Sequence, residues 1–214
     1  MIVFDLDDTL YKEIDFWHSG MKAVARAAAS AAEAPGLYAR MMSAPDPLAD
    51  AITVASAESG IPEKTLVDVY RYHRPEITLD PEAAYVLATL RDRGQRLALI
   101  TDGRSRTQRA KIDALGLARF IPDSRISISE EVGDTKKSPL PFERLMSLNP
   151  SEKEWTYVGD NPEKDFFHPN RLGWDTVMLD DNGRNIFWQS LAPGGEYAAK
   201  HRITTLLSLL DLII

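Results

Sequence analysis

The sequence predicts an α/β protein whose doubly wound parallel sheet is interrupted by an all-helical insert. Short apolar runs alternate with helical stretches after residue 80, a further apolar run stands at residues 1–4, and residues 12–79 contain no convincing strand. Alternating strands and helices favour a mostly parallel sheet that is covered by helices on both faces. We therefore expect a Rossmann-like core of residues 1–11 and 80–214 and a helical cap of residues 12–79.

The insert is predicted to hold three helices and a connector. Residues 17–33 are alanine-rich and have high helix propensity, and Pro35-Gly36 is a helix stop signal. Residues 47–59 and 62–71 each open near a proline, which is common at the first helical position. Residues 74–81 are predicted to be an extended connector.

The core is predicted to alternate helix and strand after residue 80. Glycines that follow three of the helical stretches are typical helix ends. The expected elements are helices at 81–93, 105–115, 139–148, 162–172 and 203–214, and strands at 97–101, 125–129, 155–158 and 176–179.

Composition limits the classes of function. The chain has 214 residues and a formal net charge of −7, which argues against nucleic acid or an anionic membrane as its main partner. It has no cysteine, so disulfides and cysteine-ligated zinc are excluded, and its four histidines show no metal-ligand spacing. No apolar run approaches the roughly 20 residues that span a bilayer. We expect a soluble, cytoplasmic protein.

The first apolar run leads directly into acids, in Phe4-Asp5-Leu6-Asp7-Asp8-Thr9-Leu10. Asp5 and Asp7 are two residues apart, so they point the same way in an extended segment. Two like charges at such a short separation repel each other unless a cation or a proton lies between them. The pair therefore suggests a metal site or acid–base chemistry. A helix–loop–helix calcium site is excluded, because its required Gly and Glu positions hold Leu10 and Phe16.

Polar residues also follow three later apolar runs. They are Thr101-Asp102-Gly103, then Lys136 within 133–142, and then Gly159-Asp160 through Asp165. Taken singly, they read as ordinary turns, helix caps or surface lysines. Because the carboxyl ends of parallel strands meet at one edge of a sheet, their order predicts one shared cleft.

These four segments, in this order, resemble the four motifs of the haloacid dehalogenase superfamily, in the subfamily that carries a helical cap after the first motif. The resemblance implies that Asp5 is a nucleophile that forms an aspartyl-phosphate and that Asp7 is the acid–base group. The acid role requires a pKa raised enough for Asp7 to hold a proton.

The resemblance also implies the rest of the site. Phosphate would be held by the Thr101 hydroxyl, by N–H groups near Asp102 and Gly103, and by the charge of Lys136. The family usually has Pro after the catalytic lysine, and the Lys137 found there is an alternative to Lys136. Mg²⁺ would be bound by Asp5, the backbone carbonyl of Asp7, and Asp160, with Asp165 as a further ligand or as an orienting group.

The implied activity is Mg²⁺-dependent hydrolysis of a small phosphate monoester. Asp7 favours an ester over a halide, because an alkoxide leaving group needs a general acid. The run Gln108-Arg109-Ala110-Lys111-Ile112 resembles sugar-phosphate and nucleotide phosphatases of the superfamily, so the expected partner is a small phosphorylated metabolite, a sugar phosphate or a nucleotide monophosphate. The alternatives are a phosphomutase and a catalytically idle binding module.

Substrate choice is predicted to depend on the insert and on the turn after the first strand. The candidate substrate residues are Tyr11, Trp17, His18 and Arg104, although Trp17 and His18 equally suit packing roles. The basic residues Arg104, Arg106, Arg109 and Lys111 suit an anionic substrate, but most of them are expected on a solvated helix face. The oligomeric state is not predicted.

Overall fold

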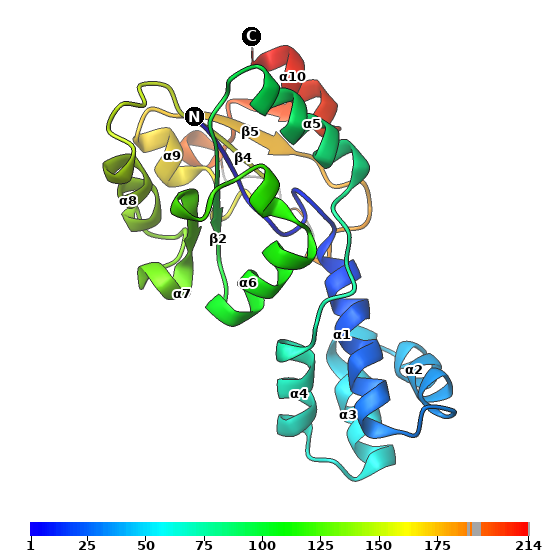
Figure 1. Cartoon of the computed structure of the whole chain (residues 1–214). Coiled ribbons are helices and arrows are strands. Elements are labelled where there is room, and N and C mark those ends of the chain that lie inside the picture. The colour runs from blue at the N-terminus through cyan, green and yellow to red at the C-terminus, as the bar shows by residue number, and fades with distance from the viewer. Residues whose placement is uncertain (188, 190–193, 214) are drawn as a thin grey trace. The chain divides into compact units, whose positions relative to one another are not determined.

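The computed structural model of the protein describes residues 1–187, 189 and 194–213, and the chain forms two compact units (Figure 1). The α/β unit comprises Met1–Ile14 and Thr78–Ile214, and the helical unit comprises Asp15–Ile77.

Within the described residues, six parallel strands form one sheet in the order β3-β2-β1-β4-β5-β6. In chain order they are β1 (Ile2–Phe4), β2 (Leu97–Thr101), β3 (Ile126–Ile128), β4 (Thr156–Gly159), β5 (Asp175–Leu179) and β6 (His201–Ile203). The central strand β1 pairs with β2 and β4, so Phe4 lies between Leu99 and Val158. The predicted doubly wound, Rossmann-like parallel sheet is confirmed.

Helices cover both faces of this sheet (Figure 1). They are α5 (Pro81–Asp92), α6 (Ser105–Ala114), α7 (Ser129–Val132), α8 (Leu140–Leu148), α9 (Phe167–Arg171) and α10 (Leu209–Leu212). Val3 and Tyr157 pack in one apolar cluster with Phe142 of α8 and with Phe166, which directly precedes α9. Because strand side chains alternate, Phe4 and Leu99 face the other way, toward the side where α5 lies beside α10.

Two predicted elements of the α/β unit differ in the structure. The helix expected at 162–172 begins only at Phe167, because the Asp165 carboxylate accepts the N–H of Asn161 at 2.9 Å and folds the preceding residues into a loop. The helix expected at 203–214 is shortened to α10, and the strand β6 stands before it; Ile214 lies outside the described residues. Two of the three β6 residues are exposed, so the strand has no apolar run to reveal it.

The helical unit, all of whose residues are described, contains α1 (Glu13–Ala28, which starts in the α/β unit), α2 (Ala34–Met42), α3 (Pro47–Ser59) and α4 (Glu63–Tyr72). The prediction of three helices was wrong, because it did not include α2. Pro35-Gly36 was expected to end a helix, but it lies in the first turn of α2. Proline is tolerated there because the first helical N–H groups have no intrahelical acceptor. Packing against α1 is close at Gly20, where a Cβ atom would lie 2.3 Å from Tyr70 Cδ2 of α4.

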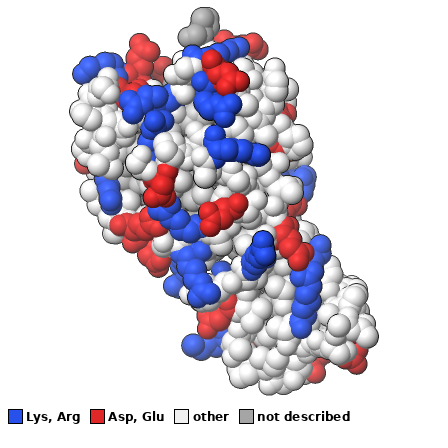
Figure 2. All heavy atoms as spheres, viewed as in Figure 1, with Lys and Arg blue, Asp and Glu red and all other residues white. Residues whose placement is uncertain are grey.

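Acidic and basic side chains are interspersed on the face of the α/β unit that Figure 2 shows. That face therefore presents no broad field of a single sign. Among the residues that the structure describes, none of the helices combines the length and the apolar character that crossing a bilayer requires.

Candidate active site

The acids predicted from the sequence meet where the sheet changes winding direction. Asp5 directly follows β1 and Asp160 directly follows β4, and these neighbouring strands flank the switch point at which open α/β sheets bind ligands. Carboxylate oxygens of Asp5, Asp160 and Asp165 lie within 4.8 Å of one another, and all three residues are buried.

A buried lysine lies against these acids. The Nζ atom of Lys136 is 2.8 Å from Asp5 Oδ2 and 2.6 Å from Asp165 Oδ1, and its side chain is fully buried. Its backbone N–H donates to Asp102 Oδ1 at 3.0 Å, so the carboxylate that follows β2 anchors the loop that carries the lysine. Lys137 is exposed. Of the two lysines, Lys136 is thus the one that contacts Asp5.

Asp165 has both carboxylate oxygens engaged within the chain. Oδ1 accepts from Lys136 and Oδ2 accepts from the N–H of Asn161. The carboxylate also lies close to the end of β4, because a Cβ atom on Gly159 would be 2.5 Å from Asp165 Oδ2. This geometry suits Asp165 to orienting Lys136.

Burial and mutual repulsion perturb the acids of the site. Burial, opposed by the charge of Lys136, raises the pKa of Asp5 to about 6. Burial together with the charges of Asp165 and Asp5 raises the pKa of Asp160 to about 9. Burial disfavours the charged form of Lys136, but the charges of Asp165 and Asp5 outweigh it and raise the lysine pKa well above its usual value.

The donor set fits a divalent cation. If all three buried carboxylates were ionised, their charge would exceed that of the Lys136 ammonium, which contacts two of them. An additional cation would relieve the repulsion that raises the Asp160 pKa. Oxygen donors from a few carboxylates are the ligands that suit Mg²⁺.

Asp160 is held by a residue that the sequence did not suggest. Asn185 Nδ2 donates to Asp160 Oδ2 at 3.0 Å, and Lys12 Nζ donates to Asn185 Oδ1 at 2.7 Å. The lysine fixes which end of the Asn185 amide faces the carboxylate, because only the carbonyl oxygen can accept from it. Asn185 belongs to no recognisable motif, so no sequence signal could have found it.

Asp7 has a different environment from the one predicted. Its carboxylate accepts from Lys111 Nζ at 2.7 Å, from the Tyr11 hydroxyl, and from Gln108 Nε2 at 3.0 Å. Burial favours the protonated form, but the charge of Lys111 and these hydrogen bonds prevail and lower the pKa of Asp7. The expectation of a raised pKa was wrong. The prediction that the basic residues of α6 mostly lie on a solvated face was also wrong for Lys111, whose exposed fraction is 3%.

The predicted phosphate-binding groups are partly engaged. Thr101 is buried and its Oγ1 accepts from Gln108 Nε2 at 2.6 Å. The N–H of Gly103, expected to hold phosphate, donates instead to Ser129 Oγ at 2.9 Å. The N–H of Ser105, the first residue of α6, donates to Glu130 Oε2 at 2.8 Å. Because the Thr101 hydroxyl accepts the bond from Gln108, it keeps its own hydrogen to offer an anion.

The candidate substrate residues are dispersed. Tyr11 is buried against Asp7, and Arg104 is exposed just before α6. Trp17 and His18 belong to α1 in the helical unit, where Trp17 is buried and His18 Nδ1 is 2.7 Å from the Tyr38 hydroxyl. Their role in substrate choice stays a prediction.

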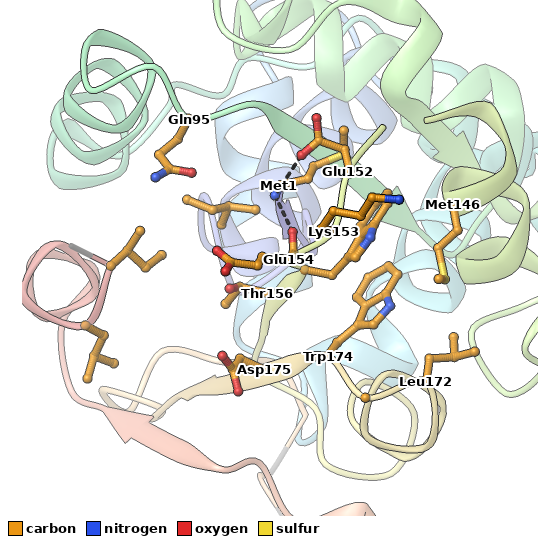
Figure 3. Close-up of a pocket in the computed structure, with 15 residues that line it drawn as sticks. Met1, Gln95, Met146, Glu152, Lys153, Glu154, Thr156, Leu172, Trp174 and Asp175 are labelled. Atoms are coloured by element: carbon orange, nitrogen blue, oxygen red, sulfur yellow. Dashed lines mark hydrogen bonds and ion pairs between the residues drawn. The ribbon is translucent and has the colours of Figure 1, made fainter. Parts of the chain in front are cut away.

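A cavity of about 530 Å³ lies at the opposite edge of the sheet (Figure 3). Its lining includes Ile2, Thr156 and Asp175, the first residues of β1, β4 and β5. The Met1 ammonium contacts Glu152 and the backbone oxygen of Glu154 there. The predicted catalytic residues follow the other ends of these strands, so this cavity is separate from the candidate site.

The fold and the site together define a class of protein: a doubly wound α/β enzyme with a carboxylate–lysine centre at its switch point. The family model for haloacid dehalogenase-like hydrolases matches residues 1–166. The chain belongs to this family of hydrolases.

Two relatives of known activity and one solved structure illustrate the similarity. The ribulose-1,5-bisphosphate 5-phosphatase of Halopiger xanaduensis is 31% identical over 64% of this chain and 58% of its own length. The phosphoserine phosphatase of Thermus thermophilus is 37% identical over 56% of this chain and 49% of its own. The chain thus matches only about half the length of these relatives.

The structural similarity extends over the whole chain. The HAD-hydrolase YfnB of Bacillus subtilis, solved with bound magnesium, has a TM-score of 0.71 and 20% identity, with 99% of this chain and 97% of that protein covered. At this identity the similarity supports the fold alone.

Proposed function

We propose that this protein is a Mg²⁺-dependent phosphatase that hydrolyses a small phosphate monoester through an aspartyl-phosphate on Asp5. The contact of Asp5 with the buried Lys136, beside Asp160 and Asp165, carries the proposal. The named activities of the two relatives, both phosphatases of small phosphorylated metabolites, support the reaction class. A sugar phosphate or nucleotide monophosphate of the cytoplasm is the expected substrate.

The proposed reaction has two halves. A carboxylate oxygen of Asp5 attacks phosphorus, and the bond between phosphorus and the ester oxygen breaks with its electron pair going to that oxygen, which takes a proton from Asp7. Water then loses a proton to Asp7 and attacks phosphorus, which frees Asp5 and inorganic phosphate. The lowered pKa of Asp7 suits the second half, in which it acts as a base. For the first half, the negative charge of the bound phosphate would have to raise this pKa so that Asp7 holds the proton that it donates.

The remaining groups bind and orient. Lys136 neutralises charge between Asp5 and the phosphate, and Thr101 donates its hydroxyl hydrogen to a phosphate oxygen. Mg²⁺ would be held by Asp5, Asp160 and the backbone carbonyl of Asp7, and would neutralise phosphate charge as a Lewis acid. Asp165 keeps Lys136 in position.

The test is release of inorganic phosphate from a panel of sugar phosphates, nucleotide monophosphates and phosphoserine, with Mg²⁺ and with EDTA. We expect Mg²⁺-dependent turnover that is abolished in Asp5→Asn and unchanged in Asp113→Asn, a matched variant at an exposed position of α6. Acid-quenched wild-type protein should carry a phosphoryl group on the peptide that contains Asp5.

Three other outcomes would contradict this proposal. Transfer of phosphate within a sugar bisphosphate, in place of transfer to water, would identify a phosphomutase. Absence of turnover on every ester would favour an idle binding module. Full activity of Asp5→Asn would refute the proposed nucleophile.

A further inference from the structure

Helix α6 sends two buried polar side chains toward the site. Gln108 is 2% and Lys111 is 3% exposed, and both contact Asp7. We propose that Gln108 and Lys111 are positioning residues that hold the Asp7 carboxylate and the Thr101 hydroxyl in a fixed relation from one helix. This inference rests on the proposed phosphatase function.

The two side chains fix both oxygens of one carboxylate. Lys111 Nζ lies 2.7 Å from Asp7 Oδ1, and Gln108 Nε2 lies 3.0 Å from Asp7 Oδ2. Residues three apart on a helix are neighbours on the same face, so one rigid element presents both donors. Donors on both oxygens restrict rotation of the carboxylate as well as its translation.

Gln108 also connects Asp7 with the phosphate-binding group. Its Nε2 atom lies 2.6 Å from Thr101 Oγ1, so the two N–H bonds of one amide can serve both residues. The amide orientation follows from chemistry, because an ionised carboxylate can only accept. A hydroxyl that accepts from this amide keeps its own hydrogen, which is directed away from Gln108 and is available to a phosphate oxygen.

The loop after β2 leaves room for this bridge. A Cβ atom on Gly103 would lie 3.0 Å from both Cγ and Cδ of Gln108. Gly103 also has a φ of 149°, a conformation that other residues rarely adopt. The glycine of the second motif thus admits the glutamine that connects Thr101 to Asp7.

A purely structural role would give different results from a positioning role. A buried Lys111–Asp7 pair could serve only to attach α6 to the loop after β1. In that case its loss would lower stability and reduce turnover of all esters by the same factor. A positioning role predicts an effect that depends on how much help the leaving group needs from Asp7.

The experiment compares Lys111→Met and Gln108→Leu with Arg109→Met, a variant on the same helix whose side chain pairs with Glu131 and Asp123 instead. The substrates are an alkyl phosphate, whose alkoxide needs a proton, and p-nitrophenyl phosphate, whose phenolate does not. The measured quantity is kcat/KM, because it reports the steps up to the first irreversible bond cleavage. Circular dichroism establishes that each variant is folded.

Loss of either donor makes Asp7 easier to protonate, but it also frees the carboxylate to move out of reach of the leaving oxygen. Because misplacement should outweigh the easier protonation, we expect Lys111→Met and Gln108→Leu to lower kcat/KM for the alkyl phosphate about 10-fold more than for p-nitrophenyl phosphate, a fraction of what general acid catalysis contributes. Arg109→Met should leave the ratio unchanged. Inorganic phosphate should inhibit Gln108→Leu less strongly than Lys111→Met, because only Gln108 touches Thr101.

Equal loss on both esters, or no loss, in either folded variant overturns the positioning role. If Lys111→Met does not fold, the uncharged Gln108→Leu decides alone. A wild-type protein that releases phosphate from neither ester refutes the proposed function itself, and this inference with it.

Discussion

Gly159→Ala tests the architecture of the site without removing any functional group. The new Cβ would lie 2.5 Å from Asp165 Oδ2, 2.9 Å from Asp165 Cγ and 3.1 Å from Tyr157 Cε1. Overpacking of this kind costs about 1–3 kcal/mol of folding free energy. Because Gly159 is the last residue of a buried strand, we expect the Asp165 carboxylate to move instead of the backbone.

Movement of that carboxylate should affect catalysis more than stability. Asp165 holds Lys136 at 2.6 Å, and Lys136 in turn contacts Asp5 at 2.8 Å. A misplacement of about 1 Å can slow a reaction roughly 10²-fold, so a loss of this order is expected in phosphate release.

The matched control is Gly173→Ala. Gly173 has a φ of 78° and nothing within 4 Å of its Cβ position, so alanine there costs about 1–2 kcal/mol through backbone strain alone. Urea unfolding should show similar stability losses for the two variants, and only Gly159→Ala should lose activity. If Gly159→Ala turns over its ester as fast as Gly173→Ala, Asp165 does not act through Lys136 as described.

Two further predictions concern the cation. Asn185→Ala should weaken Mg²⁺ binding about 10- to 100-fold, because it frees the Asp160 carboxylate, and calorimetric titration that finds an unchanged affinity would contradict this. The stabilisation by Mg²⁺ should also grow between pH 6 and pH 9. Folding raises the pKa of Asp5 to about 6 and of Asp160 to about 9, so the metal-free native state holds protons that the unfolded chain has lost and becomes less stable as pH rises through these values. If Mg²⁺ binds as proposed, it would replace those protons, so the Tm increase that Mg²⁺ produces over EDTA should be larger at pH 9 than at pH 6 in the wild type. In Asp160→Asn the increase should be nearly the same at both pH values. Equal increases at both pH values in the wild type would exclude this coupling.

The sheet could be predicted because its signals are local. Short apolar runs followed by Asp5, Thr101 and Asp160 carry both the strand and its functional end in a few adjacent residues. A local signal can also have two meanings. Pro35-Gly36 was predicted to end a helix, but proline is equally common in the first turn of a helix, which is where the pair lies in α2. The strand β6 had no apolar run, and only its pairing with β5 reveals it.

The side chains that support the site could not be found in this way. Adjacent lysines are equivalent in sequence, and only burial distinguishes Lys136 from Lys137. Lys111 lies in a polar helix, where a basic residue usually reaches solvent, and its burial depends on the loop after β1. Asn185 approaches Asp160 only because β5 lies beside β4 in the sheet.

The central place of β1 has a consequence for biosynthesis. The strand that leads to Asp5 is translated before both of its hydrogen-bonded neighbours, β2 and β4, which lie far along the chain. Pairings this distant in sequence form late, because a long loop must close first. The centre formed by Asp5, Lys136 and Asp160 should therefore assemble only after β4 has been translated.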